Sequence, residues 1–212
     1  DDEFFTLYLS YAGYKGVMEA LATGADQHPP VFYWITYALL DTFGYSPVTL
    51  RMPATVGFWA MLLCLFAVVS RHRSNLLGYL AFLLPATTSV FWYAYEARGY
   101  GLMLGFTGTA FLFWDLAIDR VRRGLTVPLF GASLALAVCA GHYYGILIVL
   151  PFAFGTFVYM VARRKIDFWL VVAHAAPLIP IVVFWSSIRS ARGYSAHFWA
   201  KPQSSAIEGA MY

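Results

Sequence analysis

Long apolar runs separated by short polar segments make up most of the chain. Residues 52–70, 76–93 and 100–118 are three such runs, each with few charged side chains. A helix needs roughly 20 residues to cross a hydrocarbon core of about 30 Å. Each of the three runs therefore predicts one membrane-spanning helix.

Two further stretches continue this pattern toward the carboxyl terminus. Residues 126–162 form an apolar run about twice as long as one span needs. This run must fold back on itself, and the segment GHYYG at 141–145 supplies the turn. Residues 168–188 predict a sixth span that Pro177 and Pro180 would kink. The predicted fold is an all-α polytopic membrane helical bundle of about six spans.

The amino-terminal region has shorter apolar segments. Residues 4–14 and 31–43 show helical spacing but are too short to cross a bilayer, so we expect in-plane helices. The prediction is one domain, with a first extracytoplasmic loop at 1–51, a bundle at 52–188 and the start of a further loop at 189–212. We expect another span upstream of the sequence and further chain beyond it.

Composition supports a membrane protein. Hydrophobic residues make up 60% of the chain and charged residues only 12%, with a mean hydropathy of +0.64. This leaves too little polar surface for a soluble globule. The net charge of +3 comes from short clusters rather than a continuous basic stripe, which argues against nucleic-acid binding. Cys64 and Cys139 lie inside apolar runs and indicate neither a disulfide nor a metal site.

The basic clusters predict the orientation of the bundle. They follow the first, third and fifth predicted spans, at Arg71, Arg73, Arg120, Arg122, Arg123, Arg163, Arg164 and Lys165. Cytoplasmic loops carry the excess of Lys and Arg. The 1–51 segment is therefore expected on the extracytoplasmic side of a plasma membrane, together with the loops near Glu96 and His142.

This orientation places most of the unusual polar residues on the extracytoplasmic side. They are Asp2, Glu3, Glu19, Asp26, His28, Arg51, Glu96, Arg98, His142, Arg189 and Arg192. The span centres carry almost no ionisable residue, which favours a reaction at the surface over transport through the membrane. Asp115 and His174 lie near the cytoplasmic ends, where snorkelling accounts for them.

Several of these residues could act in catalysis or binding, and each also has a simpler structural explanation. Asp2 and Glu3 suit acid–base chemistry but equally a solvated terminus. Asp26 and His28 would share one side of an extended segment, or only begin a helix. Arg98 could grip a phosphate, although an aromatic belt with a surface ion pair explains the same segment.

The turn and the last span add further candidates. His142 and Tyr143 lie in the 141–145 turn, where interfacial anchoring is the alternative to binding. Arg189 and Arg192 follow the last span against the positive-inside trend and suggest an anionic ligand.

Five short motifs in this order resemble the GT-C membrane glycosyltransferases. The nearest branch resembles bacterial relatives of the dolichyl-phosphate-mannose protein mannosyltransferases and of the lipid A aminoarabinose transferase. The motifs are Asp2-Glu3, Asp26-x-His28-Pro29-Pro30-Val31-x-Tyr33, Phe43-Gly44-x-Ser46-x-x-x-Leu50-Arg51-Met52-Pro53, Glu96-Ala97-Arg98-x-Tyr100 and His142-Tyr143-Tyr144.

The resemblance implies a bacterial multi-span enzyme that moves a sugar from a polyprenyl-phosphate donor to a hydroxyl of a lipid, glycan or protein acceptor. In that family the Asp of the acidic pair is the base, here Asp2, with Glu3 as its supporting carboxylate. Asp26, His28, Arg98 and Tyr100 match motifs that face the same cavity.

Chemical requirements agree with these assignments. Displacing a lipid phosphate from an anomeric carbon needs a base at the acceptor, and a buried carboxylate with a raised pKa would suit that role. It also needs positive charge or a donor at the leaving oxygen, which His28, Arg98, His142 and Arg189 could supply. Attack opposite the phosphate would invert the anomeric configuration.

No cofactor is required by this chemistry, although some members of the family bind a divalent metal. The candidate ligands here are Glu3, Asp26, His28 and His142, but their spacing matches no metal motif.

Two other classes of function stay open at this level. A polytopic transporter or lipid flippase would use the outer acidic residues as a vestibule, but the broken helices in matching halves that favour it are not seen. A non-catalytic membrane scaffold predicts that Asp2, Asp26, His28 and Arg98 point apart, whereas an enzyme predicts that they converge on one cavity.

Overall fold

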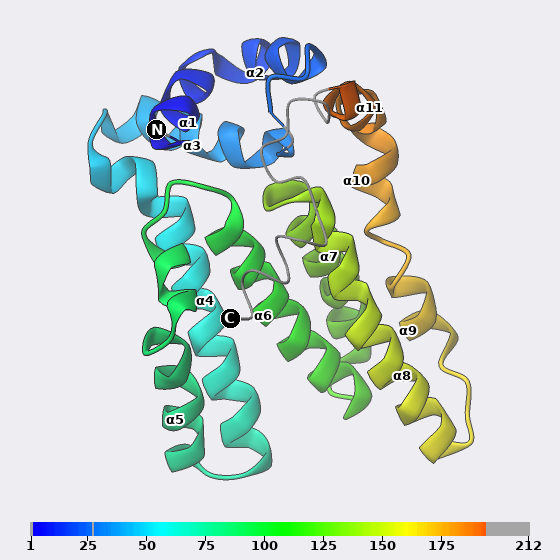
Figure 1. The fold of residues 1–212 in the computed structure, drawn as a ribbon. Coiled ribbons are helices and arrows are strands. Elements are labelled where there is room, and N and C mark those ends of the chain that lie inside the picture. Colours follow the sequence, from blue (N-terminus) through cyan, green and yellow to red (C-terminus); the bar gives the residue numbers. More distant parts are fainter. Residues whose placement is uncertain (1, 27, 194–212) are drawn as a thin grey trace, which may run out of the picture.

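The computed structural model describes residues 2–26 and 28–193, and within this part of the chain all regular structure is helical (Figure 1). The side chains of Asp2 and Arg192 lie outside what is described. Three short helices cover one end of a bundle of longer ones. The covering helices are α1 (Asp2–Tyr11), α2 (Gly13–Ala22) and α3 (Pro30–Phe43).

Four elements are long and apolar enough to cross a membrane. They are α4 (Pro47–His72), α6 (Tyr100–Ile118), α7 (Arg123–Ala140) and the continuous stretch Tyr143–Arg163, which joins η2 (Tyr143–Ile148) to α8 (Val149–Arg163). The run 126–162 is thus divided at the predicted turn. These helices indicate an integral membrane protein.

The segment 76–93 differs from its prediction. It is α5 (Asn75–Ala86) followed by a 3₁₀ turn, η1 (Ser89–Ala94), and both pack along α4. Pro85 near the end of α5 cannot donate a backbone hydrogen bond, and the helix ends one residue later. A helix of 12 residues is shorter than one span requires.

The last predicted span is broken as well. It divides into α9 (Phe168–Ala173), α10 (Leu178–Val183) and α11 (Trp185–Gly193), and the chain bends by 67° at the break before α11. Counting this bent pair as one span gives up to five spans in the described residues, where the sequence predicted six. The described start of the predicted 189–212 loop belongs to α11, which packs on α2.

The amino-terminal layer is more helical than predicted. The predicted helix 4–14 is two helices separated at Gly13, whose φ of +70° belongs to the left-handed region that glycine favours. α3 begins and ends as expected, with Pro30 in its first turn and Gly44 after its last residue. Figure 1 shows α1, α2 and α3 lying across the end of the bundle, which we call the capped end.

Close contact between α4 and α6 organises the bundle. A Cβ at Gly101 would lie 2.4 Å from the Ala54 carbonyl oxygen, and one at Gly57 would lie 2.3 Å from that of Gly101. Gly105, four residues after Gly101, also packs on Gly57. This small-residue seam allows two backbones to touch, as at many membrane helix interfaces.

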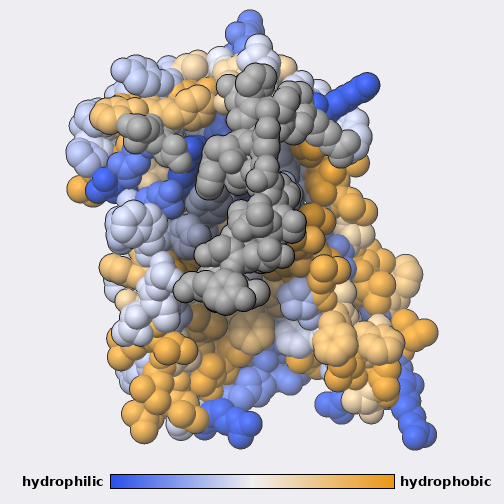
Figure 2. Space-filling view, in the orientation of Figure 1, coloured by the Kyte–Doolittle hydropathy of each residue, from blue (hydrophilic) through white to orange (hydrophobic). Residues whose placement is uncertain are grey.

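The basic clusters occupy the opposite end, here called the basic end. It is formed by the ends of α4, α6 and α8 and the start of α7 (Figure 1). In Figure 2 the hydrophilic side chains visible on this face gather mainly at the two ends, with mostly hydrophobic ones between. Such a band is typical of a protein that faces hydrocarbon at its middle.

Candidate functional site

Polar side chains from three segments meet beneath the helices of the capped end, and Asp26 is at their centre. One carboxylate oxygen of Asp26 lies 3.0 Å from Nδ1 of His28. The other accepts hydrogen bonds from the guanidinium of Arg98 at 3.1 Å and from the hydroxyl of Tyr33. The side chains of Asp26, His28 and Arg98 are only 13%, 9% and 12% exposed. We call this group the Asp26 cluster.

Local backbone geometry places Asp26 and His28 together. Gly24 has a φ of +83° and lets the chain reverse after α2, close to the backbone of α11. Pro29 is extended before α3, and its fixed φ gives the segment a defined direction. Arg98 arrives from the turn between η1 and α6.

Aromatic rings surround His28. The ring of His142 lies edge-on at 4.8 Å between centroids, and that of Tyr100 at 5.6 Å. His142 is stacked on Tyr144, with centroids 4.7 Å apart. Nε2 of His28 is buried and has no hydrogen-bond partner among the residues that the structure describes. A buried polar nitrogen without a partner is costly, and a ligand atom would satisfy it.

Among the described residues, Glu3 contacts Arg51 and the segment that precedes Arg98. Its carboxylate makes two hydrogen bonds of 2.8 Å to Arg51, in the fork geometry of a bidentate pair. It also accepts a 3.2 Å bond from the amide of Ala97, whose carbonyl accepts one from Thr6. Glu3 therefore ties α1 to α4 and fixes the peptide that precedes Arg98.

The electrostatic state of the carboxyl groups follows from these contacts. Burial would raise the pKa of Asp26, but the interactions with His28, Tyr33 and Arg98 outweigh it and hold the pKa well below its usual value. The hydrogen bonds from Arg51 lower the pKa of Glu3. Both acids are ionised at neutral pH, and neither has the raised pKa expected of a base.

Two neighbouring groups have pKa values shifted toward their neutral forms. Burial and the charge of Asp26 raise the pKa of the Tyr33 hydroxyl well above its normal value, so Tyr33 stays a donor. Burial and the positive charge of His28 lower the pKa of His142 to about 4. His142 is therefore neutral near pH 7.

Of the remaining predicted site residues, Tyr143 and Arg189 do not join the cluster among the described residues. The Asp2 side chain, proposed as the base, lies outside the described residues. The hydroxyl of Tyr143 is buried, and among the described residues it forms no hydrogen bond with Asp26, His28 or any other group. Arg189 is exposed on α11, and among the described residues no hydrogen bond or ion pair links it to the cluster.

Three participants were not among the predicted site residues. Tyr33 belongs to a quoted motif, and its position seven residues after Asp26 contains no signal that its hydroxyl would return to that carboxylate. Arg51 was named among the outer polar residues and in the third motif without a partner, and in the structure it pairs with Glu3 across 48 positions. Tyr144, which is 71% exposed, stacks on His142 and could cover the site.

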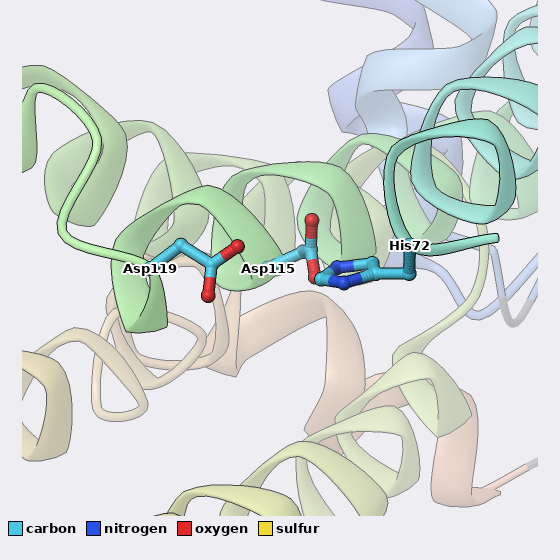
Figure 3. Close-up of side chains that lie close together, drawn as sticks. All are labelled: His72, Asp115 and Asp119. Atoms are coloured by element: carbon cyan, nitrogen blue, oxygen red, sulfur yellow. The ribbon is translucent and has the colours of Figure 1, made fainter.

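Metal-ligand geometry occurs at the other end of the bundle. Side-chain ligand atoms of His72, Asp115 and Asp119 lie within 4.8 Å of one another (Figure 3). The predicted set of Glu3, Asp26, His28 and His142 forms no such group in the described residues. The two carboxylates of this group are already paired with a guanidinium. Arg71 donates hydrogen bonds to Asp115 at 3.1 Å and to Asp119 at 2.7 Å.

The same network corrects the prediction for Asp115. Its side chain is 6% exposed and bonds Nε2 of His72 at 2.6 Å, so it does not snorkel to the surface. It clamps the end of α4 to α6. His174 also bonds within the fold, to the carbonyl of Leu170 at 2.7 Å.

An apolar groove of ≈ 590 Å³ lies between α4, α6 and the η2–α8 stretch. Its wall on α6 runs from Leu104 to Trp114. Leu104 is one helical turn from Tyr100, a rise of about 6 Å, and the ring of Tyr100 lies against that of His28. One end of the groove wall is therefore about one turn along α6 from a residue that contacts the cluster.

No protein-family model, curated protein or solved structure matches this chain.

Proposed function

We propose that the Asp26 cluster is the donor site of a membrane glycosyltransferase. The enzyme would transfer a sugar from a polyprenyl-phosphate carrier to an acceptor hydroxyl, on the side of the membrane opposite the basic end. One observation carries the proposal: a nearly buried Asp26–His28–Arg98 cluster holds a His28 Nε2 that has no hydrogen-bond partner among the described residues. An apolar groove lined by Leu104, one helical turn along α6 from Tyr100, supports it.

The cluster suits the leaving phosphate. Asp26 holds Nδ1 of His28, which leaves Nε2 to donate a hydrogen bond to a phosphate oxygen when His28 is protonated. The guanidinium of Arg98 adds fixed positive charge at the same place. Asp26 itself is ionised and already accepts three bonds, so its role is to orient these cations rather than to accept a proton.

The groove supports a lipid-linked donor. A polyprenyl chain needs an apolar surface that continues from its phosphate site, and the groove begins about one turn below Tyr100. In this arrangement the phosphate binds at the cluster and the first isoprenoid units lie along α6.

The transfer itself would be a single displacement. The acceptor oxygen attacks the anomeric carbon, the bond from that carbon to the phosphate oxygen breaks, and the acceptor proton passes to a carboxylate. Motif order assigns that carboxylate to Asp2. Charge that develops on the departing phosphate is stabilised by His28 and Arg98.

The convergence of Asp26, His28 and Arg98 favours a binding site over a scaffold, in which these side chains would have no reason to meet. The Asp26 cluster also lies at one end of the bundle, which favours surface chemistry over a transport path.

The test is sugar transfer from radiolabelled polyprenyl-phosphate donors by the full-length protein in liposomes. His28→Gln should lower kcat/KM about tenfold to a hundredfold, the value of one hydrogen bond to a charged group. Lys15→Gln, at an exposed residue outside the cluster, serves as the control and should leave kcat/KM unchanged. Asp2→Asn should abolish transfer and leave donor binding intact, and undiminished turnover in both Asp2→Asn and His28→Gln would remove the proposal.

A further inference from the structure

A second cavity, of ≈ 200 Å³, lies at the basic end of the molecule. It is formed where the α6–α7 connection meets the end of α8 and the start of α9. Four cations and one carboxylate line it: Arg120, Arg123, Arg163, Lys165 and Asp167. Nothing in the proposed sugar transfer uses this site.

The charge in the cavity is not balanced. Asp167 is engaged twice, because it pairs with Arg123 and also accepts the amide of Leu170 at the start of α9. Among the described residues, Arg120 and Lys165 have no acidic partner, and Arg163 only lies over the ring of Tyr159. Three positive charges are therefore left without a carboxylate.

One nitrogen inside this group also lacks a partner. Nε of Arg123 is buried and makes no hydrogen bond. Arg123 begins α7, a helix without a side-chain cap at its amino end. An anion seated in the cavity would satisfy the nitrogen and interact favourably with the positive end of the helix dipole.

The backbone around the cavity is held in an uncommon conformation. Arg120, Arg122 and Arg164 have φ values of 61°, 43° and 49°, and they are the only non-glycine residues with positive φ in the described chain. This region is unfavourable for residues with a Cβ. All three lie in or beside the two connections that form the cavity, as expected where local strain accompanies a function.

The rim of the cavity is apolar. Ile166, Phe168 and Trp169 are 79%, 64% and 68% exposed and follow directly after Lys165. Exposed aromatic and aliphatic side chains beside cations are typical of the membrane interface, where they contact lipid chains while the cations contact headgroups.

We propose that this cavity binds the phosphate headgroup of an anionic phospholipid, with the acyl chains lying against Ile166, Phe168 and Trp169. Its surplus of cations complements the lipid phosphate, and the exposed apolar rim distinguishes a lipid from a free phosphate ion. The inference is independent of the proposed sugar transfer.

Native mass spectrometry of the full chain in uncharged detergent tests the proposal. The protein is offered equal amounts of phosphatidylglycerol and phosphatidylcholine, and the ratio of bound lipids is measured. The wild type should retain phosphatidylglycerol preferentially. Arg163→Gln with Lys165→Gln should lower that ratio about 25-fold, since each of the two cations near an anionic headgroup contributes about fivefold.

Lys15→Gln with Arg73→Gln is the matched control, because it removes the same charge from two exposed residues outside the cavity and should leave the ratio unchanged. Arg120→Asn repeats the test with a residue that tolerates positive φ, so a folding defect in the first variant does not decide the outcome. Equal loss in the control, no preference in the wild type, or displacement of phosphatidylglycerol by millimolar inorganic phosphate would overturn the proposal.

Discussion

Asp26 is the residue on which the polar cluster depends, because its carboxylate accepts hydrogen bonds from three side chains. Some of its contacts could be predicted from sequence spacing and others could not. The spacing of Asp26 and His28 was compatible with a shared side of an extended segment or with only the start of a helix, and in the structure they bond at 3.0 Å. The Arg98 contact, 72 positions away, has no local signal.

Replacing Asp26 tests this central role. Asp26→Asn would remove the nearly buried negative charge that His28, Tyr33 and Arg98 contact, which should destabilise the fold by about 3 kcal/mol. Unfolding in mixed detergent micelles measures the change. Glu19→Gln breaks the exposed Lys15–Glu19 pair and should cost no more than about 0.5 kcal/mol. Equal effects of the two substitutions would contradict the structural role of Asp26.

His142 predicts a pH dependence of stability. Histidine in an unfolded chain takes up a proton near pH 6.5, whereas folded His142 does so only near pH 4. Between these values a falling pH protonates the unfolded state alone. The contribution of His142 is therefore present above pH 6.5 and is lost progressively toward pH 4.

The measurement is the thermal unfolding midpoint of the wild type and His142→Gln in detergent from pH 8 to pH 5. This interval stays above the pH range in which Glu3 and Asp26 would contribute, because both have lowered pKa values. The wild type should lose stability across the interval, and the variant should lose less. Parallel curves would exclude His142 as the responsible group.

At the scale of elements, hydropathy located the helices well where they are regular. The predicted spans 52–70 and 100–118 lie within or coincide with α4 and α6, because a long apolar run has one low-energy structure in a bilayer. The prediction of a continuous span was wrong at 76–93, where Pro85 and a 3₁₀ turn interrupt the helix. The stretch 168–188, which was predicted to be kinked, is divided into three helices that can together count as one bent span. In these two stretches the backbone geometry depends on packing against α4 and α7.

The contact between α4 and α6 gives a prediction at this scale. Gly101→Val would place its Cβ 2.4 Å from a carbonyl oxygen of α4, so the helices must separate. We expect a loss of about 3 kcal/mol or more in unfolding free energy. Gly124→Ala, in open space near the start of α7, should instead be neutral or slightly stabilising. Similar losses in both variants would show that the seam does not limit stability.

At the scale of the whole molecule, polarity separates two ends with different chemistry. The capped end holds a nearly buried anion–cation cluster, and the basic end holds the unbalanced cations and the Arg71–Asp115–Asp119 network. The positive-inside rule predicts that the basic end faces the cytoplasm and that the proposed sugar-transfer site lies on the opposite side.

Cysteine labelling tests this orientation. With Cys64 and Cys139 replaced by alanine, a cysteine at Tyr144 should react with a membrane-impermeant maleimide in intact cells. A cysteine at Arg73 should react only after the cells are permeabilised. Both positions are exposed in the fold, so burial would not explain a difference. The reverse pattern would invert the topology and place the Asp26 cluster in the cytoplasm.

Local sequence properties determined the membrane class, the main spans and the two unlike ends, because hydropathy and charge act residue by residue. Motif order also indicated most members of the cluster. Only the tertiary structure decided which side chains pair. Glu3 accepts hydrogen bonds from Arg51, and Asp26 accepts them from Tyr33 and Arg98. Asp115 is buried and bonds His72 and Arg71. Such pairs form through space, and whether a carboxylate is solvated or buried depends on which helices pack around it.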